Sequence, residues 1–260
     1  MKVVLFCGGL GMRLREYSEN IPKPMVPIGY RPILWNIMKY YAYFGHKEFI
    51  LCLGYKADMI KNYFVHYDEY ISNNFIFKKG GKEIEMLNTD IDDWKITFVD
   101  TGVNSNIGER LMKVKDYLKK DEVFLANYSD GLTNMYLPDM IDWFMETDKF
   151  ASFMAYQPTS SFHVVKLQEN STVNSISHIG NSGLWINTGF FILRKEIFNY
   201  MQPGDELVKQ PFERLIEEEK LISYKYNGFW ASMDTFKDRQ KLDDCYNRGN
   251  SPWEVWRKNC

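Results

Sequence analysis

The 260-residue sequence is poor in cysteine and in net charge, and each scarcity excludes a class of protein. Its four cysteines are scattered, with no C-x-x-C pair and no metal-ligand spacing, which argues against a disulfide framework or a cysteine metal site. A formal net charge of −2 offers no overall attraction for nucleic acid or an anionic membrane. We therefore expect neither as a partner, and any phosphate site must be built locally.

Long apolar runs are also missing. No stretch approaches the roughly 20 residues that a bilayer span needs. The start of the chain, MKVVLFC, is too brief for a signal sequence and leads into Gly8 and Gly9 without a small-residue cleavage site. We expect a cytoplasmic protein with reduced thiols, in which residues 2–7 form a buried first strand.

Strand-like and helical segments alternate in the first half of the sequence. Short apolar runs followed by glycine or polar residues are typical of strands buried on both faces of a parallel sheet. The strand–helix order predicts a right-handed parallel α/β sheet. The predicted strands are 2–7, 48–53, 95–100 and 123–126, and the predicted helices are 33–44, 56–67, 108–118 and 137–146.

The pattern changes at two places. Between residues 66 and 93 the sequence lacks the spacing of apolar residues typical of helices or strands. We predict that this segment is an inserted arm. After residue 150, strand-like runs follow one another, and helical spacing returns only near the end. There is no internal repeat or low-complexity linker, so we predict a single domain over 1–260. The later predicted strands are 151–157, 162–168, 172–178 and 184–193, and the later predicted helices are 210–219 and 235–247.

The loop after the first strand is rich in glycine and carries basic residues. Gly8, Gly9 and Gly11 let the backbone approach an anion closely. Arg13 supplies a planar charged fork, and Lys23 lies between two prolines that stiffen its backbone. The loop therefore predicts a phosphate site. A tight strand-to-helix turn that needs glycine for geometry alone is the alternative.

Two other phosphate-binding motifs fail on spacing. A dinucleotide fingerprint needs a third glycine where this sequence has Leu14, and an acid at the end of the second strand. That strand ends in LCLG at residues 51–54, without an acid. The P-loop pattern is absent as well. A dinucleotide-dependent oxidoreductase is thus disfavoured.

Motifs along nearly the whole chain resemble the sugar-phosphate nucleotidyltransferase family, in particular its glucose-1-phosphate cytidylyltransferase branch. The resemblance implies a Rossmann-like (GT-A-like) α/β fold with a mixed, mostly parallel sheet flanked by helices. It also implies a nucleotide-binding half over about 1–149 and an acceptor-binding half over about 150–260. The motifs are LFCGGLGMRL (5–14), PKPMVPIG (22–29), PILWNIMK (32–39), GYK (54–56), VDTG (99–102), GERL (108–111), GFW (228–230) and MDT (233–235).

The same resemblance implies Mg²⁺ as cofactor and CTP as substrate. Asp130, just after a buried strand, and Asp234 would bind the metal, which takes one or two carboxylates plus phosphate oxygens. Arg13 and Lys23 would complete the catalytic set by holding the β- and γ-phosphates. A turn acid at 130 and a helix N-cap at 234 are the structural alternatives.

Further residues fall on the family's nucleotide-binding positions. The set comprises Gly8, Gly9, Gly11, Thr101 and Ser129, together with Arg110, which resembles the family's second arginine on the nucleotide. For Arg110 the alternative is a solvated helix charge. No residue need become a covalent nucleophile, because the acceptor already carries an ionised oxygen; positioning and charge neutralisation supply most of the catalysis.

The acceptor half departs from the family pattern. His178 and Ile179 stand where sugar-using members carry glutamate and lysine, and His163 stands where they carry a glycine. Asn187 and Gly189 are retained, and Trp230 belongs to the matching GFW segment. Surface or packing roles for the two histidines are the alternative. Since the departures concentrate on acceptor positions, we expect an altered acceptor pocket.

Two acceptors fit this expectation equally. One is phosphorylated L-glutamine, giving CDP-L-glutamine, as used by a similar cytidylyltransferase branch of capsule phosphoramidate biosynthesis. The other is an unusual sugar 1-phosphate. The remaining alternatives are an ordinary glucose-1-phosphate cytidylyltransferase and a non-catalytic nucleotide-binding module on the same fold. Related enzymes are often homo-oligomers, so we expect one here.

Overall fold

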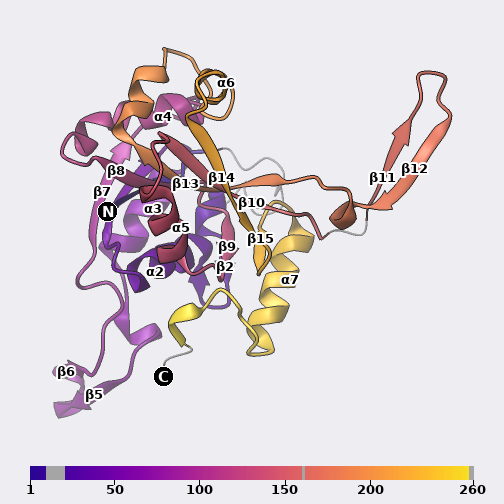
Figure 1. Cartoon of the computed structure of the whole chain (residues 1–260). Coiled ribbons are helices and arrows are strands. Elements are labelled where there is room, and N and C mark those ends of the chain that lie inside the picture. Colours follow the sequence, from indigo (N-terminus) through magenta and orange to yellow (C-terminus); the bar gives the residue numbers. More distant parts are fainter. Residues whose placement is uncertain (10–20, 160–161, 258–260) are drawn as a thin grey trace.

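The structure, a computed structural model, describes residues 1–9, 21–159 and 162–257. A seven-stranded sheet lies at its centre, in the order β14-β10-β13-β8-β1-β4-β7 (Figure 1). Neighbours pair in parallel except where β13 takes part, so the predicted mixed, mostly parallel sheet is confirmed. The strands are β1 (Lys2–Phe6), β4 (Glu48–Leu53), β7 (Lys95–Asp100), β8 (Val123–Asn127), β10 (Ala151–Tyr156), β13 (Ile186–Arg194) and β14 (Leu221–Tyr226).

Helices cover both faces of this sheet. Alternate residues of β1 face opposite ways, with Val3 and Leu5 in one core cluster and Val4 and Phe6 in the other. The first cluster lies under α2 (Ile33–Tyr43), α3 (Ala57–Val65), α5 (Leu137–Met145) and α7 (Phe236–Asn247). The second lies under α4 (Ile107–Val114), η5 (Lys115–Leu118), η7 (Lys195–Tyr200) and α6 (Gln210–Glu217).

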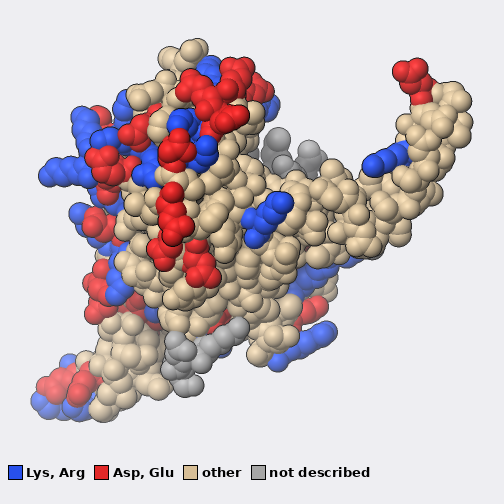
Figure 2. Space-filling view, in the orientation of Figure 1, with Lys and Arg blue, Asp and Glu red and all other residues tan. Residues whose placement is uncertain are grey.

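Two hairpins project from opposite sides of the body (Figure 1). The predicted arm holds β5 (Phe75–Lys78) and β6 (Glu83–Met86), and the other hairpin pairs β11 (His163–Leu167) with β12 (Val173–His178). Few charged side chains are visible on the β11–β12 hairpin (Figure 2). The remaining elements are β2 (Pro27–Ile28), β3 (Arg31–Pro32), β9 (Gly131–Thr133), β15 (Trp230–Ser232), η2 (Lys23–Met25), η3 (Glu69–Ile71), η4 (Lys79–Gly81), η6 (Ile179–Asn181) and η8 (Val255–Arg257).

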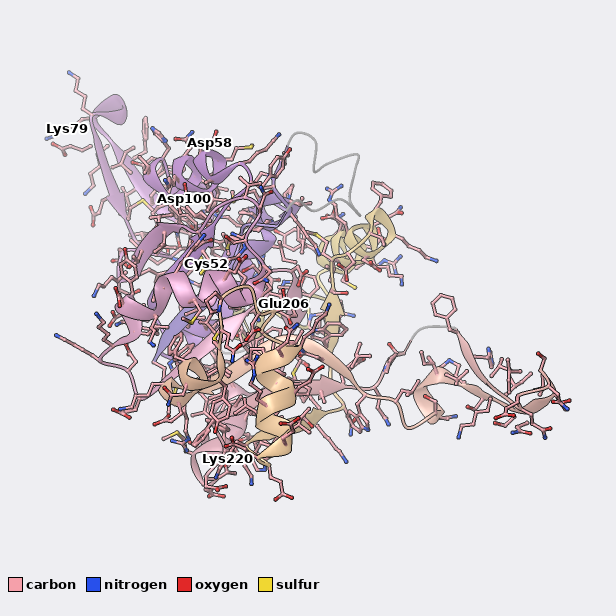
Figure 3. All side chains as sticks on the ribbon, turned by 90° about the horizontal axis from the view of Figure 1, so that it is seen from above. Cys52, Asp58, Lys79, Asp100, Glu206 and Lys220 are labelled. Carbon is pink, nitrogen blue, oxygen red and sulfur yellow. The ribbon has the colours of Figure 1, made fainter. Side chains whose placement is uncertain are left out.

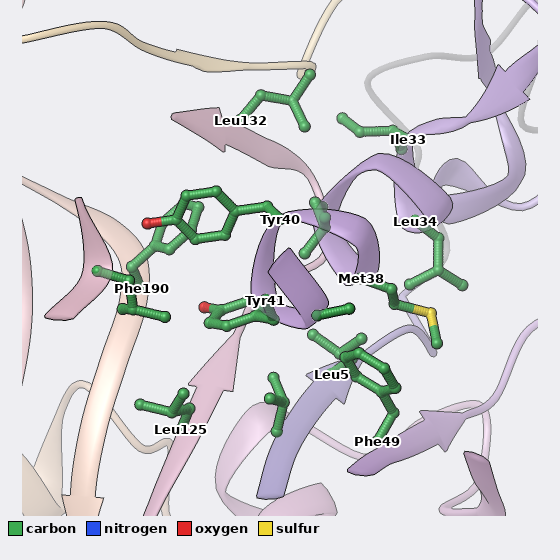
Figure 4. Packing of buried hydrophobic residues seen from close by; sticks show 14 of the residues in the cluster. Leu5, Ile33, Leu34, Met38, Tyr40, Tyr41, Phe49, Leu125, Leu132 and Phe190 are labelled. Carbon is green, nitrogen blue, oxygen red and sulfur yellow. The ribbon is translucent and has the colours of Figure 1, made fainter. Parts of the chain in front are cut away.

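Helix α2 is the centre of the larger core cluster. Nine of its eleven residues are buried, because it packs between the sheet and the C-terminal segment. Tyr40 and Tyr41 both meet Phe190 of β13, with ring centroids 5.9 and 6.2 Å apart (Figure 4). Tyr41 also accepts a hydrogen bond from Asn127 of β8 at 3.3 Å. These contacts join the two halves of the chain, so the sheet and its core are shared by both.

The C-terminal segment is anchored by one tryptophan. Trp253 is 1% exposed, and its indole N–H donates to the Asn36 side chain at 3.2 Å. Its ring lies 5.9 Å from that of Phe229, close to β15. Within the described ranges no helix is long and apolar enough to cross a membrane.

Replacing this anchor should cost much of the domain's stability. We expect Trp253→Ala to lower the free energy of unfolding by about 3–5 kcal/mol, because a large buried ring leaves a cavity. Urea denaturation followed by circular dichroism measures the loss. Ile216→Ala, at a 61% exposed position on α6, should change it by no more than about 0.5 kcal/mol. Equal losses in both variants would contradict the anchoring role.

Candidate active site

The centre of the site is one ammonium group between two carboxylates. Lys23 Nζ lies 2.6 Å from Asp130 Oδ2 and 2.8 Å from Asp234 Oδ1. Burial opposes the charge of Lys23, but the two aspartates outweigh it and raise the pKa of the lysine. Three segments far apart in the sequence therefore meet at one charged point, as the motifs predicted.

A short strand pair brings the two aspartates together. Asp130 lies between β8 and β9, Asp234 follows β15, and β15 pairs antiparallel with β9. The N–H of Met233 donates to the Asp130 carbonyl at 2.8 Å, which completes the register. The N-cap of α7 is Thr235, whose side chain accepts from the Asp238 N–H, so Asp234 is not the helix cap that was the structural alternative.

Ser129 sets the direction in which the chain leaves β8. It is fully buried and has a φ of +65°, a left-handed conformation that is uncommon outside glycine. Its N–H donates to the Asn127 side chain at 2.7 Å, and its hydroxyl accepts from Cys7 Sγ at 3.4 Å. These bonds stabilise a strained turn directly before Asp130.

Arg110 is buried and ties three backbone segments together. Its Nη1 donates to the Leu53 carbonyl and to the Thr101 hydroxyl, at 3.1 and 2.7 Å. Its Nη2 donates to the carbonyls of Gly8 and Val103, at 3.0 and 3.3 Å. Burial lowers the pKa of this arginine. At 2% exposure it is not the solvated helix charge that was the alternative.

A cavity of about 650 Å³ opens beside these groups at the carboxyl ends of β1 and β8. Parallel α/β sheets bind ligands at this edge. The cavity contains the charged cluster at Lys23 and a wall formed by the segment between β7 and α4. Its lining residues are Phe6, Cys7, Gly9, Lys23, Pro24, 103–107, Arg110, Tyr128, Ser129, Asp130, Glu206 and Asp234.

Comparison with known proteins identifies the family. The nucleotidyl transferase family model matches residues 2–238. The chain is a member of the nucleotidyl transferase family. It is 36% identical over 258 residues to a probable glucose-1-phosphate cytidylyltransferase of Bacillus subtilis, covering 98% of this chain and all of the relative. A glucose-1-phosphate cytidylyltransferase of Salmonella typhi is also 36% identical, with the same coverage.

Solved structures of low sequence identity share the fold of this nucleotidyltransferase. HddC from Yersinia pseudotuberculosis superimposes with a TM-score of 0.65 at 22% identity, covering 94% of this chain and 99% of HddC. A UDP-glucose pyrophosphorylase complexed with UDP-glucose gives 0.69 at 14% identity, covering 95% of this chain and 98% of the other. The predicted Rossmann-like fold is confirmed.

Four of the eight predicted nucleotide-binding residues of the nucleotidyltransferase, and both predicted metal-binding aspartates, line the cavity. Gly9, Lys23, Arg110, Ser129, Asp130 and Asp234 line it. Gly8 and Thr101 lie behind it, where both contact the Arg110 guanidinium. Gly11 and Arg13 fall outside the described residues.

Three predicted acceptor residues lie next to the segment from Tyr128 to Gly131. Gly189 has a φ of +81°, and a side chain there would meet the Tyr128 ring at 2.3 Å. Asn187 hydrogen-bonds both the Gly189 N–H, at 2.9 Å, and the Tyr128 hydroxyl. The Trp230 indole lies beside Gly131, and its N–H is buried without a partner in the described structure. None of the three lines the cavity, so their acceptor role stays a prediction.

The other predicted acceptor residues lie on the β11–β12 hairpin. His163 and His178 are register partners there, with ring centroids 5.6 Å apart, and Ile179 begins η6 at the end of β12. His178 Nδ1 accepts from the Gly180 N–H at 3.1 Å. Neither histidine nor Ile179 lines the cavity. Contact with the acceptor therefore stays a prediction for all three.

Sequence reasoning missed part of the cavity wall. The family resemblance placed the base, ribose and α-phosphate at the region from Thr101 to Arg110, which includes residues 103–107 of the wall. It gave no role to Tyr128 or Glu206, although both line the cavity. Glu206 lies on the segment between η7 and α6 (Figure 3). No motif includes it, so the sequence carried no signal for this position.

The glycine loop of the nucleotidyltransferase offers a matched test. A Cβ at Gly8 would lie 1.9 Å from Arg110 Nη1, whereas a Cβ at Gly9 would meet none of the described residues within 4 Å. We expect Gly8→Ala to destabilise the fold by about 1–3 kcal/mol, because four bonds prevent the guanidinium from moving. Gly9→Ala should unfold at the wild-type temperature. Thermal unfolding compares them, and equal melting temperatures for the two variants would contradict the packing role of Gly8.

Proposed function

We propose that this nucleotidyltransferase is a Mg²⁺-dependent cytidylyltransferase. It moves CMP from CTP to the phosphate of a small phosphorylated acceptor and releases pyrophosphate. The observation that carries the proposal is the convergence of Lys23, Asp130 and Asp234 at the cavity. The names of the two relatives, both glucose-1-phosphate cytidylyltransferases at 36% identity, support the choice of nucleotide.

The donor set at this point fits magnesium. Two carboxylates already converge on one cationic atom, and magnesium characteristically takes one or two carboxylates with phosphate oxygens and water. Among the described residues no three His, Cys, Asp or Glu side chains group as a metal site, so a fully protein-ligated ion is not expected there. Asp130 and Asp234 would hold the ion, which when bound neutralises charge on the phosphates.

The reaction needs no covalent enzyme intermediate. An oxygen of the acceptor phosphate attacks the α-phosphorus of CTP, the bond from the α-phosphorus to the bridging oxygen breaks, and pyrophosphate leaves. Lys23 would hold the β- and γ-phosphates and stabilise the departing charge. Cys7, the thiol in the cavity lining, is no competing nucleophile, because burial raises its pKa to about 12 and keeps it protonated.

The acceptor we favour is phosphorylated L-glutamine. The replacement of a family lysine by Ile179 removes a charge that a sugar phosphate uses in related enzymes. The cations of the described cavity lining are Lys23 and Arg110, and Arg110 is engaged by protein oxygens. Glucose 1-phosphate is the second candidate, because the relatives at 36% identity bear its name.

Removing either charge of the aspartate pair should abolish turnover. We expect Asp130→Asn and Asp234→Asn each to lower kcat by about 10²-fold or more, a loss typical of removing electrostatic stabilisation. Pyrophosphate release from CTP in the presence of Mg²⁺ and acceptor measures it. Asp116→Asn, at an exposed position in η5, is the matched control and should retain full activity. Wild-type rates in folded Asp130→Asn would favour a different metal site.

Comparing kcat/KM for the two candidate acceptors tests which of them the enzyme prefers. We expect kcat/KM with phosphoglutamine to exceed that with glucose 1-phosphate, because His178 and Ile179 replace the glutamate and lysine that sugar-using members of the family carry. The same pyrophosphate assay measures both. A higher kcat/KM with glucose 1-phosphate would instead identify an ordinary glucose-1-phosphate cytidylyltransferase. Mg²⁺-independent CTP binding without turnover on either acceptor would indicate a non-catalytic module.

A further inference from the structure

Glu206 is an acidic residue of the cavity that the proposed reaction does not use. The other acids of the described lining are Asp130 and Asp234, which form the cluster with Lys23. A carboxylate with no cation beside it would repel a triphosphate, so the position of Glu206 marks a part of the cavity that the phosphates do not occupy. A carboxylate there accepts hydrogen bonds, which points to a donor group on the bound ligand.

The carboxylate stands on the wall where a nucleoside fits. Glu206 Oε2 accepts from the Ile107 N–H at 3.3 Å, and residues 103–107 form that wall. The side chains of Asn104, Ser105 and Asn106 on the same wall are polar but uncharged. The phosphates would bind at the end of the cavity that contains the Lys23 ammonium. The ribose and the base would then lie against the uncharged wall formed by residues 103–107.

The segment that carries Glu206 is rigidly attached. Asp205 pairs with Arg214 at 2.5 Å and accepts from the Gln202 N–H at 2.8 Å. The Asp205 carbonyl packs against Gly108 so closely that a Cβ there would lie 2.2 Å away. The Glu206 N–H donates to the Gln210 side chain at 3.1 Å. Glu206 is thus held in place by its backbone.

The charge of Glu206 has no neutralising partner in the part of the chain described. Among the described residues no lysine or arginine forms an ion pair with its carboxylate, whose side-chain hydrogen bond is the long one from the Ile107 N–H. One oxygen and the remaining lone pairs are left for a ligand.

We infer that Glu206 is the residue that selects cytosine over uracil. Its carboxylate accepts the exocyclic N4 amino group of cytosine, the pairing that carboxylates make with this base. Uracil presents an oxygen at that position, which the carboxylate would repel. This inference rests on the proposed use of CTP and specifies how that nucleotide is chosen.

Glu206→Gln tests the inference, because the amide keeps the shape and can still accept from Ile107 while offering an N–H₂ to the base. We expect the ratio of kcat/KM for CTP to that for UTP to fall by about 10-fold or more, as loss of one base contact implies. The ratio of the CTP and UTP affinities, measured by calorimetry with Mg²⁺ and no acceptor, should fall likewise. Glu217→Gln, at an exposed position on α6, should leave both ratios unchanged.

Unchanged ratios in Glu206→Gln would overturn the inference, and so would a raised KM for the acceptor at an unchanged nucleotide ratio, which would place Glu206 at the acceptor. Equal losses for CTP and UTP would also overturn it, because they indicate a contact with the ribose. These results differ from failure of the proposed function, in which the wild-type protein neither prefers CTP nor releases pyrophosphate from it.

Discussion

The ammonium of Lys23 holds the candidate active site together. It joins the Pro-Lys-Pro segment, the end of β8 and the segment after β15 through two short ion pairs. Two carboxylates this close to one another would repel without a cation between them. The β9–β15 pairing, the strained Ser129 and the C-terminal helix fix the backbone that carries the two aspartates, and Lys23 neutralises the charges that they bring together.

Much of the fold could be predicted from local patterns. The apolar runs that end in glycine gave β1 and β4, and the span from Pro32 to Gly45 gave α2, within a residue or so of the observed bounds. These signals are strong because a parallel strand or a helix buried on all sides is apolar along its length. The position of β13 between β8 and β10 could not be read in this way, because strand order depends on contacts far apart in the sequence.

Some residues of the candidate site could likewise be predicted from the sequence, and others could not. The family resemblance predicted that Asp130 and Asp234 lie at one metal ion and that Lys23 holds the neighbouring phosphates, and the three side chains do lie together. The motifs did not predict that Arg110 would be buried against the carbonyls of Gly8 and Leu53, because a guanidinium in a helix sequence is usually solvated. Nor could they place Glu206, whose segment reaches the site through packing against Gly108 and through the hydrogen bond from the Ile107 N–H.

In the proposed reaction the nucleotidyltransferase transfers the CMP group of CTP to the phosphate of an acceptor. The most direct measurement follows CTP labelled at the α-phosphate, with Mg²⁺ and phosphoglutamine or glucose 1-phosphate. We predict that the label enters a CDP-linked product in step with the release of unlabelled pyrophosphate, and that chelation of the metal stops both. Label that stays in CTP with folded protein, or appears only as free CMP, would contradict the account.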